Sequence, residues 1–124
     1  MKRKTKILIA EDQAISALSM QRALTRSGYD VCGMVSTGEE ALERITQEKP
    51  DLVILDVFLN GRLNGVEAAM ELRSRSGIPI VFITGYEEGK LIERIKSVKS
   101  STYLIKPFTP KALESAITKA FQNE

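Results

Sequence analysis

The sequence predicts one α/β domain in which a parallel sheet of five strands has helices on both faces. Its 124 residues suit a single domain with a sizeable core. Short apolar runs alternate with longer segments of helical periodicity along the chain, and this alternation is typical of a parallel sheet. Several of the runs are uninterrupted, as in strands buried on both faces. These runs cover residues 7–10, 52–55, 81–83 and 103–105.

The first half of the chain has clear helix boundaries. Gly28 is suited to end a helix, because glycine tolerates the left-handed backbone that often follows the last helical turn. Ser36 and Glu39 have the spacing of a capping box and predict the start of the second helix. That helix must end before Pro50. The expected elements are strand 6–10, helix 14–27, strand 30–35, a helix from Ser36 to before Pro50, and strand 51–55.

The second half continues the same pattern. A loop over residues 57–63 leads to Asn64, a favoured N-cap residue. Thr109 is another, and Pro110 follows it at the first helical position, where proline is well tolerated. The expected elements are helix 64–75, strand 79–83, helix 87–98, strand 102–105 and helix 110–122. Five such β–α units suit the flavodoxin-like strand order 2-1-3-4-5, and we expect residues 1–124 to form a single domain.

The composition excludes several classes of function. The net charge is +2, but four cations lie in the first six residues, where we expect a solvated lead-in to the first strand. Without histidine the chain has no imidazole zinc site, no Ser-His-Asp triad and no phosphohistidine of its own. Cys32 is the only cysteine, which excludes an intrachain disulfide, and its apolar surroundings predict a small core residue.

No apolar stretch approaches the roughly 20 residues that a membrane-spanning helix requires. The basic N-terminus runs directly into a short apolar strand, which differs from the pattern of a signal peptide. We therefore expect a cytosolic, cytoplasmic protein that binds neither nucleic acid directly nor a membrane.

Polar side chains stand at the ends of the predicted strands. Glu11 and Asp12 follow the first strand, Asp56 the third, Thr84 the fourth and Lys106 the fifth. An open parallel sheet binds its ligands beyond the carboxyl ends of its strands, so these groups are expected to converge. Three carboxylates brought together repel one another unless a cation lies among them. Mg²⁺ favours a few carboxylates together with a phosphate oxygen, so the sequence predicts a magnesium site.

In these residues the chain resembles the receiver domains of two-component response regulators, a family that includes the chemotaxis regulators. The matching motifs are Glu11-Asp12, Asp56, Thr84-Gly85 and Lys106-Pro107-Phe108, in the family's order. The resemblance covers nearly the whole chain. It implies a phosphoprotein of phosphorelay signal transduction, which accepts a phosphoryl group from a sensor histidine kinase or a histidine phosphotransfer protein.

The resemblance also implies a role for each motif residue. Asp56 would be the phosphoacceptor, whose carboxylate attacks the phosphorus of the donor. Thr84 and Lys106 would contact the phosphoryl group, because phosphoryl transfer depends on positioning and charge neutralisation. The Mg²⁺ ligands that it implies are Glu11, Asp12, Asp56 and the backbone carbonyl of Phe58.

A conformational switch is implied as well. Tyr103 matches an aromatic residue that turns inward when the Thr84 hydroxyl moves toward the phosphoryl group. The responding surface would be helix 87–98, strand 102–105 and the last helix, which would bind a downstream protein or form a dimer. Helix 87–98 is expected to expose a solvated charged face. That face holds Lys90, Glu93, Arg94, Lys96 and Lys99, over Leu91, Ile95 and Val98.

Three features concern the loops around the site. In the family the peptide bond before Pro107 is cis. The loop over 57–65 is one residue longer than in the commonest receivers and lacks their Met-Pro pair. Phe58 and Tyr86 are bulky and flank the phosphorylation site in the family, where they would either hinder an attacking water or only pack.

The same residues bear on three other functions. A phosphorelay intermediate or phosphate sink would use the same site without the switch. An aspartate-nucleophile phosphatase of the haloacid dehalogenase type needs a second aspartate at the position of Phe58. A flavodoxin-like redox module needs a phosphate-binding loop where Glu11 and Asp12 would repel phosphate. We therefore expect a signalling protein that catalyses only its own phosphorylation and dephosphorylation, and not an enzyme with separate substrates.

Overall fold

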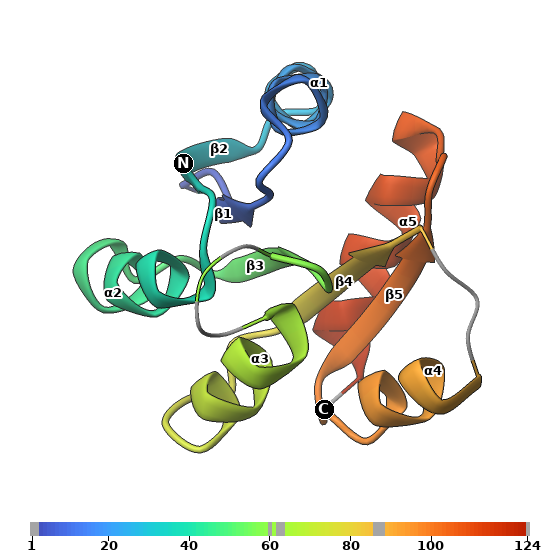
Figure 1. The fold of residues 1–124 in the computed structure, drawn as a ribbon. Coiled ribbons are helices and arrows are strands. Elements are labelled where there is room, and N and C mark those ends of the chain that lie inside the picture. Colours follow the sequence, from blue (N-terminus) through green and yellow to red (C-terminus); the bar gives the residue numbers. More distant parts are fainter. Residues whose placement is uncertain (1–2, 60, 62–63, 86–88, 124) are drawn as a thin grey trace.

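The computed structural model describes residues 3–59, 61, 64–85 and 89–123, in which strands and helices alternate along the chain (Figure 1). The strands are β1 (Lys6–Ala10), β2 (Asp30–Val35), β3 (Leu52–Asp56), β4 (Ile80–Thr84) and β5 (Ser101–Ile105). The helices are α1 (Ala14–Arg26), α2 (Gly38–Glu48), α3 (Gly65–Arg73), α4 (Gly89–Lys96) and α5 (Pro110–Gln122). None of the helices among these residues is long and apolar enough to cross a membrane.

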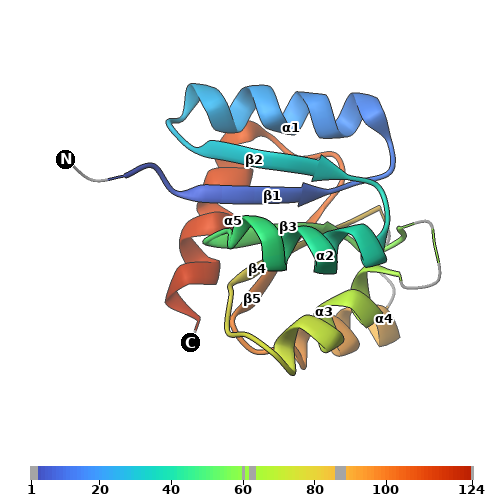
Figure 2. The same cartoon turned by 90° about the vertical axis from the view of Figure 1, so that its left-hand side faces the viewer.

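The strands form one parallel sheet in the order β2-β1-β3-β4-β5, which confirms the predicted flavodoxin-like topology. Because every strand runs in the same direction, their carboxyl ends meet at one edge of the sheet (Figure 2). The order reverses between β1 and β3, and a crevice at such a reversal is where open α/β sheets bind ligands.

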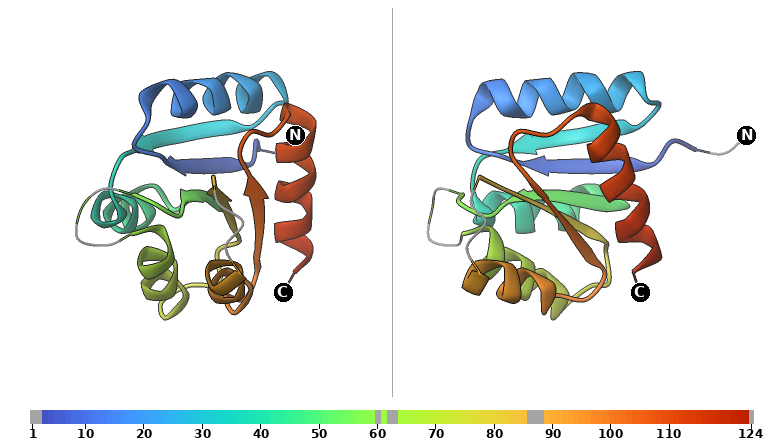
Figure 3. Two further views of the ribbon diagram at one scale, coloured as in Figure 1. Left: turned by 45° about the vertical axis from the view of Figure 1, so that its right-hand side comes forward. Right: turned by 90° about the vertical axis from the view of Figure 1, so that its right-hand side faces the viewer.

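Helices cover both faces of the sheet, and alternate residues of each strand pack beneath them. On one face, Leu8 and Phe82 belong to a core that includes residues of α2, α3 and α4. On the other, Ile9 and Ile83 pack with α1 and α5 (Figures 1 and 3). The period of two along each strand therefore sends successive side chains into different cores, which is why the central strands are apolar at every position.

The helix caps agree with the sequence except at α2. The predicted Ser36–Glu39 capping box is wrong: Thr37 is the N-cap, and its Oγ1 accepts a hydrogen bond from the backbone N–H of Glu40 at 3.1 Å. The chain is still extended at Thr37, so the N-cap lies one residue later than the predicted Ser36. The remaining predictions are confirmed, with Gly28 at φ +90° after α1, a capping box at Asn64 for α3, and Thr109 as the N-cap of α5.

Several element boundaries differ from the predicted ones by one or two residues. Asp56 and Thr84 were predicted to follow β3 and β4 but are the last residues of these strands. Asp56 still pairs with Ile83 of β4, and Thr84 still pairs with Ile105 of β5. Helix α3 ends at Arg73, two residues early. Helix α4 spans Gly89–Lys96 within the predicted 87–98, whose first residues lie outside the described part of the chain.

Two burial predictions are wrong. β5 was expected to be buried on both faces, but all its residues are only half-buried, because it is the outer strand of the sheet. Cys32 was expected in the core and is also half-buried, since β2 forms the other edge. The apolar pattern of an edge strand thus overstates its burial.

The basic lead-in is anchored to the sheet and is not merely solvated. The Arg3 guanidinium donates two hydrogen bonds to the Asp51 carboxylate, at 2.8 and 2.6 Å. The same carboxylate accepts a hydrogen bond from the backbone N–H of Lys6 at 2.7 Å. The Lys6 ammonium donates to the backbone carbonyl of Glu48 at 2.6 Å. These bonds tie the start of β1 to the start of β3.

Replacing Asp51 with asparagine should lower stability at pH 7 by about 1 kcal/mol, a value discounted because the ion pair is at the surface. The hydrogen bond from Arg3 holds the pKa of Asp51 below its ordinary value of 3.8. The contribution is therefore complete above that value and is lost as the pH falls through the lower folded-state pKa. Urea unfolding of the wild type and Asp51→Asn at pH 7 and pH 3 measures the effect. A stability difference as large at pH 3 as at pH 7 would contradict this account.

Candidate functional site

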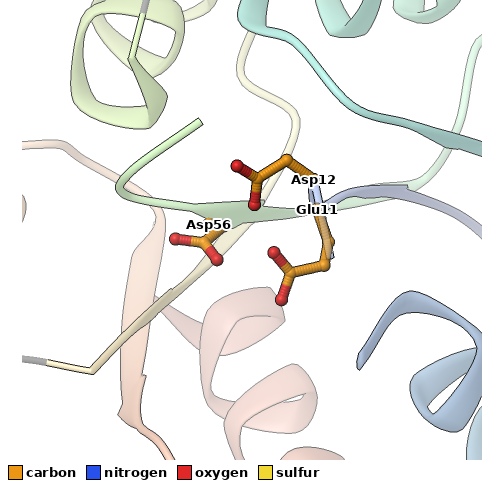
Figure 4. A group of neighbouring side chains, drawn as sticks. All are labelled: Glu11, Asp12 and Asp56. Atoms are coloured by element: carbon orange, nitrogen blue, oxygen red, sulfur yellow. The ribbon is translucent and has the colours of Figure 1, made fainter. Parts of the chain in front are cut away.

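Three carboxylates meet at the carboxyl ends of β1 and β3, as Figure 4 shows. One oxygen from each of Glu11, Asp12 and Asp56 lies within 4.8 Å of the others. Glu11 and Asp56 are buried, with exposed fractions of 3% and 5%, whereas Asp12 is half-buried. The predicted convergence of these residues is therefore observed.

Backbone hydrogen bonds fix the positions of two of these carboxylates. Glu11 directly follows β1, and its N–H donates to the carbonyl of Val35 at 2.9 Å, which joins the end of β1 to the end of β2. Asp56 ends β3, and its Oδ1 accepts a hydrogen bond from the backbone N–H of Phe58 at 2.9 Å. The N–H of Val57 donates to the Ile83 carbonyl at 2.9 Å and continues the ladder to β4.

Lys106 supplies a cation to this acidic site. Its Nζ lies 2.7 Å from Glu11 Oε1 and 2.8 Å from Asp56 Oδ2. Its backbone N–H donates to the Thr84 carbonyl at 2.8 Å, which connects β5 with the end of β4. The bond between Lys106 and Pro107 is cis, as the family resemblance implied. One ammonium therefore bridges two carboxylates that come from different strands.

The surroundings shift the pKa values of all three groups. Burial raises the pKa of Glu11 to about 7, and the neighbouring Asp56 adds to the rise while Lys106 opposes it. Burial would also raise the pKa of Asp56, but hydrogen bonds with Glu11 and Lys106 hold it below its ordinary value. Burial acts to lower the pKa of Lys106, and its bonds to Asp56 and Glu11 outweigh that and raise it. Asp56 and Lys106 are therefore charged at neutral pH.

This set of residues fits a divalent cation. The three clustered carboxyl groups offer hard oxygen ligands. When all three are ionised, their negative charge exceeds the single positive charge of the Lys106 ammonium. The raised pKa of Glu11 is the expected response of a buried carboxyl that lacks full compensation. A bound cation would favour the ionised form of Glu11.

The other predicted residues lie around this centre. Thr84 is fully buried at the carboxyl end of β4, in the strand next to that of Asp56. Tyr103 lies on β5, paired with Phe82 of β4, and its half-buried ring packs against the core beneath α2, α3 and α4. The Phe58 side chain is 52% exposed beside the site. Tyr86 lies outside the described residues.

Gly65 is a positioning residue that the sequence prediction missed. A Cβ added at this glycine would lie 2.0 Å from the backbone oxygen of Asp56 and 2.8 Å from the Val57 Cα. The N–H of Gly65 donates to the Val57 carbonyl at 2.9 Å. The first turn of α3 therefore packs directly on the backbone that presents Asp56. In the sequence, Gly65 is marked only by its place after the N-cap residue Asn64. That position indicates the start of a helix, but it does not show that the helix approaches the backbone of Asp56 closely.

The arrangement has the parts of a phosphoryl-transfer centre. A charged carboxylate can act as nucleophile, clustered carboxylates can hold a cation, and an ammonium and backbone donors can offset charge on phosphoryl oxygens. Of the residues predicted for the site, Glu11, Asp12, Asp56 and Lys106 are brought together, with Thr84 at the end of the adjacent strand.

Comparison with known proteins agrees with this geometry. The family profile of the response regulator receiver domain matches residues 7–118. The chain is 38% identical over 115 residues to the transcriptional regulatory protein PdtaR of Mycobacterium tuberculosis, covering 93% of this chain and 56% of that protein. It is 39% identical over 116 residues to the probable transcriptional regulator ycf27 of Porphyra purpurea, covering 92% and 46%. The chain thus spans about half the length of these curated relatives.

Solved structures give the same result. The signal receiver domain of a modulated diguanylate cyclase from Desulfovibrio desulfuricans superposes with a TM-score of 0.83 at 34% identity, over 98% of this chain and 99% of that one. The chemotaxis response regulator CheY4 of Vibrio cholerae superposes with a TM-score of 0.84 at 25% identity, over 94% and 98%. With the family profile covering most of its length, this chain belongs to the response regulator receiver domain family of two-component signalling.

Proposed function

We propose that Asp56 accepts a phosphoryl group from a histidine kinase or histidine phosphotransfer protein, in a Mg²⁺-dependent reaction that switches a protein-binding surface. The observation that carries this proposal is the place of Asp56. Its carboxylate clusters with those of Glu11 and Asp12, and the Lys106 ammonium lies 2.8 Å from its Oδ2. Receiver domains as a family serve such partners, which supports the assignment of the donor.

In the transfer, a carboxylate oxygen of Asp56 forms a bond to phosphorus while the bond between phosphorus and the donor histidine nitrogen breaks. The N–H of Phe58 and Nζ of Lys106 each hold one oxygen of this carboxylate, so the nucleophile is oriented before the donor arrives. Mg²⁺ held by Glu11, Asp12 and Asp56 would supply further neutralisation of charge on the phosphoryl oxygens. The product is an aspartyl phosphate whose charge Lys106 would then partly offset.

The donor protein is proposed to dock beside α1. Ile15 in the first turn of α1 is 87% exposed, and Leu18 one turn later is 41% exposed. A groove of about 320 Å³ runs from Ile15 to Phe108 and opens on Glu11 and Lys106. An apolar surface next to the nucleophile suits a partner helix that carries the phosphohistidine.

The response is proposed to travel through β4 and β5. Thr84 and Tyr103 lie on neighbouring strands, and a Thr84 hydroxyl drawn to the phosphoryl group would change the space that the Tyr103 ring can enter. Helix α4 begins at Gly89, which weakens its first turn by roughly 1 kcal/mol relative to alanine and favours a shift of this helix. The chain would act as a switch and not as an enzyme on separate substrates.

Removal of the nucleophile should abolish phosphorylation. Acetyl phosphate and Mg²⁺ are expected to add one phosphoryl group to the wild type, measured as intact mass. Asp56→Asn should show no such addition, because its amide cannot form the acyl phosphate. Asp51→Asn is the matched control and should be phosphorylated like the wild type. Asp51 lies at the amino ends of β1 and β3, whereas the site lies at their carboxyl ends. Phosphorylation of Asp56→Asn to the wild-type level would refute the assignment.

Saturating Mg²⁺ should raise the melting temperature, because a ligand at 100 times its dissociation constant adds about 2.7 kcal/mol of stability. Asp12→Ala removes one ligand and should show a much smaller shift. Asp30→Ala changes an exposed carboxylate at the start of β2 and should respond like the wild type. Thermal melts with and without Mg²⁺ measure these shifts. Equal shifts in all three proteins would exclude a metal site at the acidic cluster.

Lys106→Ala should fold and still accept a phosphoryl group, but its switch should be weakened, because the ammonium links the site to β5. Beryllofluoride stands in for the phosphoryl group, and NMR amide shifts at Tyr103 and in α4 report the response. Wild type and Lys111→Ala should shift at both places. If Lys106→Ala shifts as much as they do, Lys106 does not couple the site to β5. A wild type that shifts only around Asp56 would favour the phosphorelay or phosphate-sink alternative.

A further inference from the structure

The outer strand β5 lacks the charged side chains and bulges that commonly prevent an edge strand from pairing with another chain. Edge strands are commonly interrupted by bulges or charged side chains. β2, at the opposite edge, begins with the exposed Asp30 and has a register shift against β1. β5 carries no charged residue and pairs regularly with β4 along its whole length. Its outer backbone edge is therefore suited to accept a further strand.

The hydrogen-bond pattern shows which backbone groups face outward. The N–H of Ile80 donates to the Ser100 carbonyl at 2.9 Å, and the N–H of Lys106 donates to the Thr84 carbonyl at 2.8 Å. Backbone groups of successive residues in a strand alternate between its two sides. The N–H and C=O groups of Tyr103 and Ile105 consequently point away from β4, as do those of Ser101.

A groove runs along this edge. It has a volume of about 580 Å³ and lies between α4 and α5, which flank β5 in both views of Figure 3. At one end the side chain of Asn123 donates to the Ser101 carbonyl at 3.1 Å, which leaves Tyr103 and Ile105 as the accessible edge. The groove is lined by all five residues of β5, by Ile95 and Lys96 of α4, and by Lys119 and Asn123 near the end of α5.

The walls of the groove are positively charged. Lys96 lies on the α4 side and Lys119 on the α5 side, and both are exposed. Within the described part of the chain neither forms an ion pair, and no acidic residue lines the groove. A second copy of the chain would bring lysines against lysines, whereas an acidic segment would complement both walls.

We propose that β5 takes an extended acidic segment of a partner protein as a sixth strand of the sheet. Main-chain hydrogen bonds to Tyr103 and Ile105 would provide the pairing, and carboxylates of the segment would meet Lys96 and Lys119. This deepens the proposed function, because the groove lies on the surface assigned there to output. The pairing itself uses no group of the phosphorylation site.

The test uses the whole chain and a fluorescent ten-residue peptide with the repeat Glu-Glu-Val-Val, whose carboxylates point to both faces of the sheet and can meet both Lys96 and Lys119. Fluorescence polarisation should show binding, and amide exchange at Tyr103 and Ile105 should slow. N-methylation of alternate peptide bonds should weaken binding by about tenfold or more, because the main-chain hydrogen bonds are lost. The double variant Lys96→Glu, Lys119→Glu should instead prefer a peptide of the same pattern in which lysine replaces glutamate. Lys99→Glu, a neighbouring exposed charge outside the groove, is the matched control and should keep the preference for glutamate.

Asp56→Asn separates this inference from the proposed function, since it should bind the peptide even though it cannot be phosphorylated. The inference is overturned if the N-methylated peptide binds equally well, which would mean a contact through side chains alone. It is also overturned if the charge reversals leave the preference unchanged. Self-association that protects Tyr103 and Ile105 without peptide would show that a second copy covers the edge, and would overturn it too.

Discussion

The compensation of buried negative charge by one lysine underlies the whole site. Glu11 and Asp56 are nearly enclosed, and the Lys106 ammonium contacts both at hydrogen-bond distance. A buried carboxylate without a partner would be costly, so the end of β5 must be held close to the ends of β1 and β3. The same shortage of positive charge raises the pKa of Glu11 and makes the cluster receptive to a divalent cation. The same unbalanced negative charge therefore holds β5 close to β1 and β3 and favours a cation at the cluster.

Backbone packing makes this arrangement rigid on the β3 side. Gly65 brings the start of α3 against the carbonyl of Asp56, and Phe58 donates its N–H to the Asp56 side chain. The proposed nucleophile, Asp56, thus lies at a strand end whose position is fixed by its neighbours, which suits a reaction that depends on orientation. By contrast, Thr84 ends β4 next to β5, and Tyr103 lies on β5 itself, an edge strand whose residues are all half-buried.

The two proposed binding surfaces lie on different sides of the site. The groove beside α1 opens on Glu11 and Lys106, both of which Asp56 adjoins, so a partner there would lie next to the proposed nucleophile. The groove along β5 is reached from the sheet edge and is lined by Lys96 and Lys119. Lys106 is at the junction, because its side chain belongs to the site while its backbone directly follows β5. This geometry would allow one residue to link the two proposed surfaces.

The sequence by itself determined the topology and most of the site. Uninterrupted apolar runs, each ending in a polar residue, are sufficient to predict a parallel sheet whose strand ends bring Glu11, Asp56 and Lys106 to one edge, because strand direction and side-chain alternation follow from local pattern. Tertiary structure alone decided three other matters. The burial of β5 depends on its place in the strand order, the requirement for Gly65 depends on how closely α3 approaches β3, and the elevated pKa of Glu11 depends on what surrounds it. Each of these is set by distances between segments far apart in the chain, which local composition does not encode.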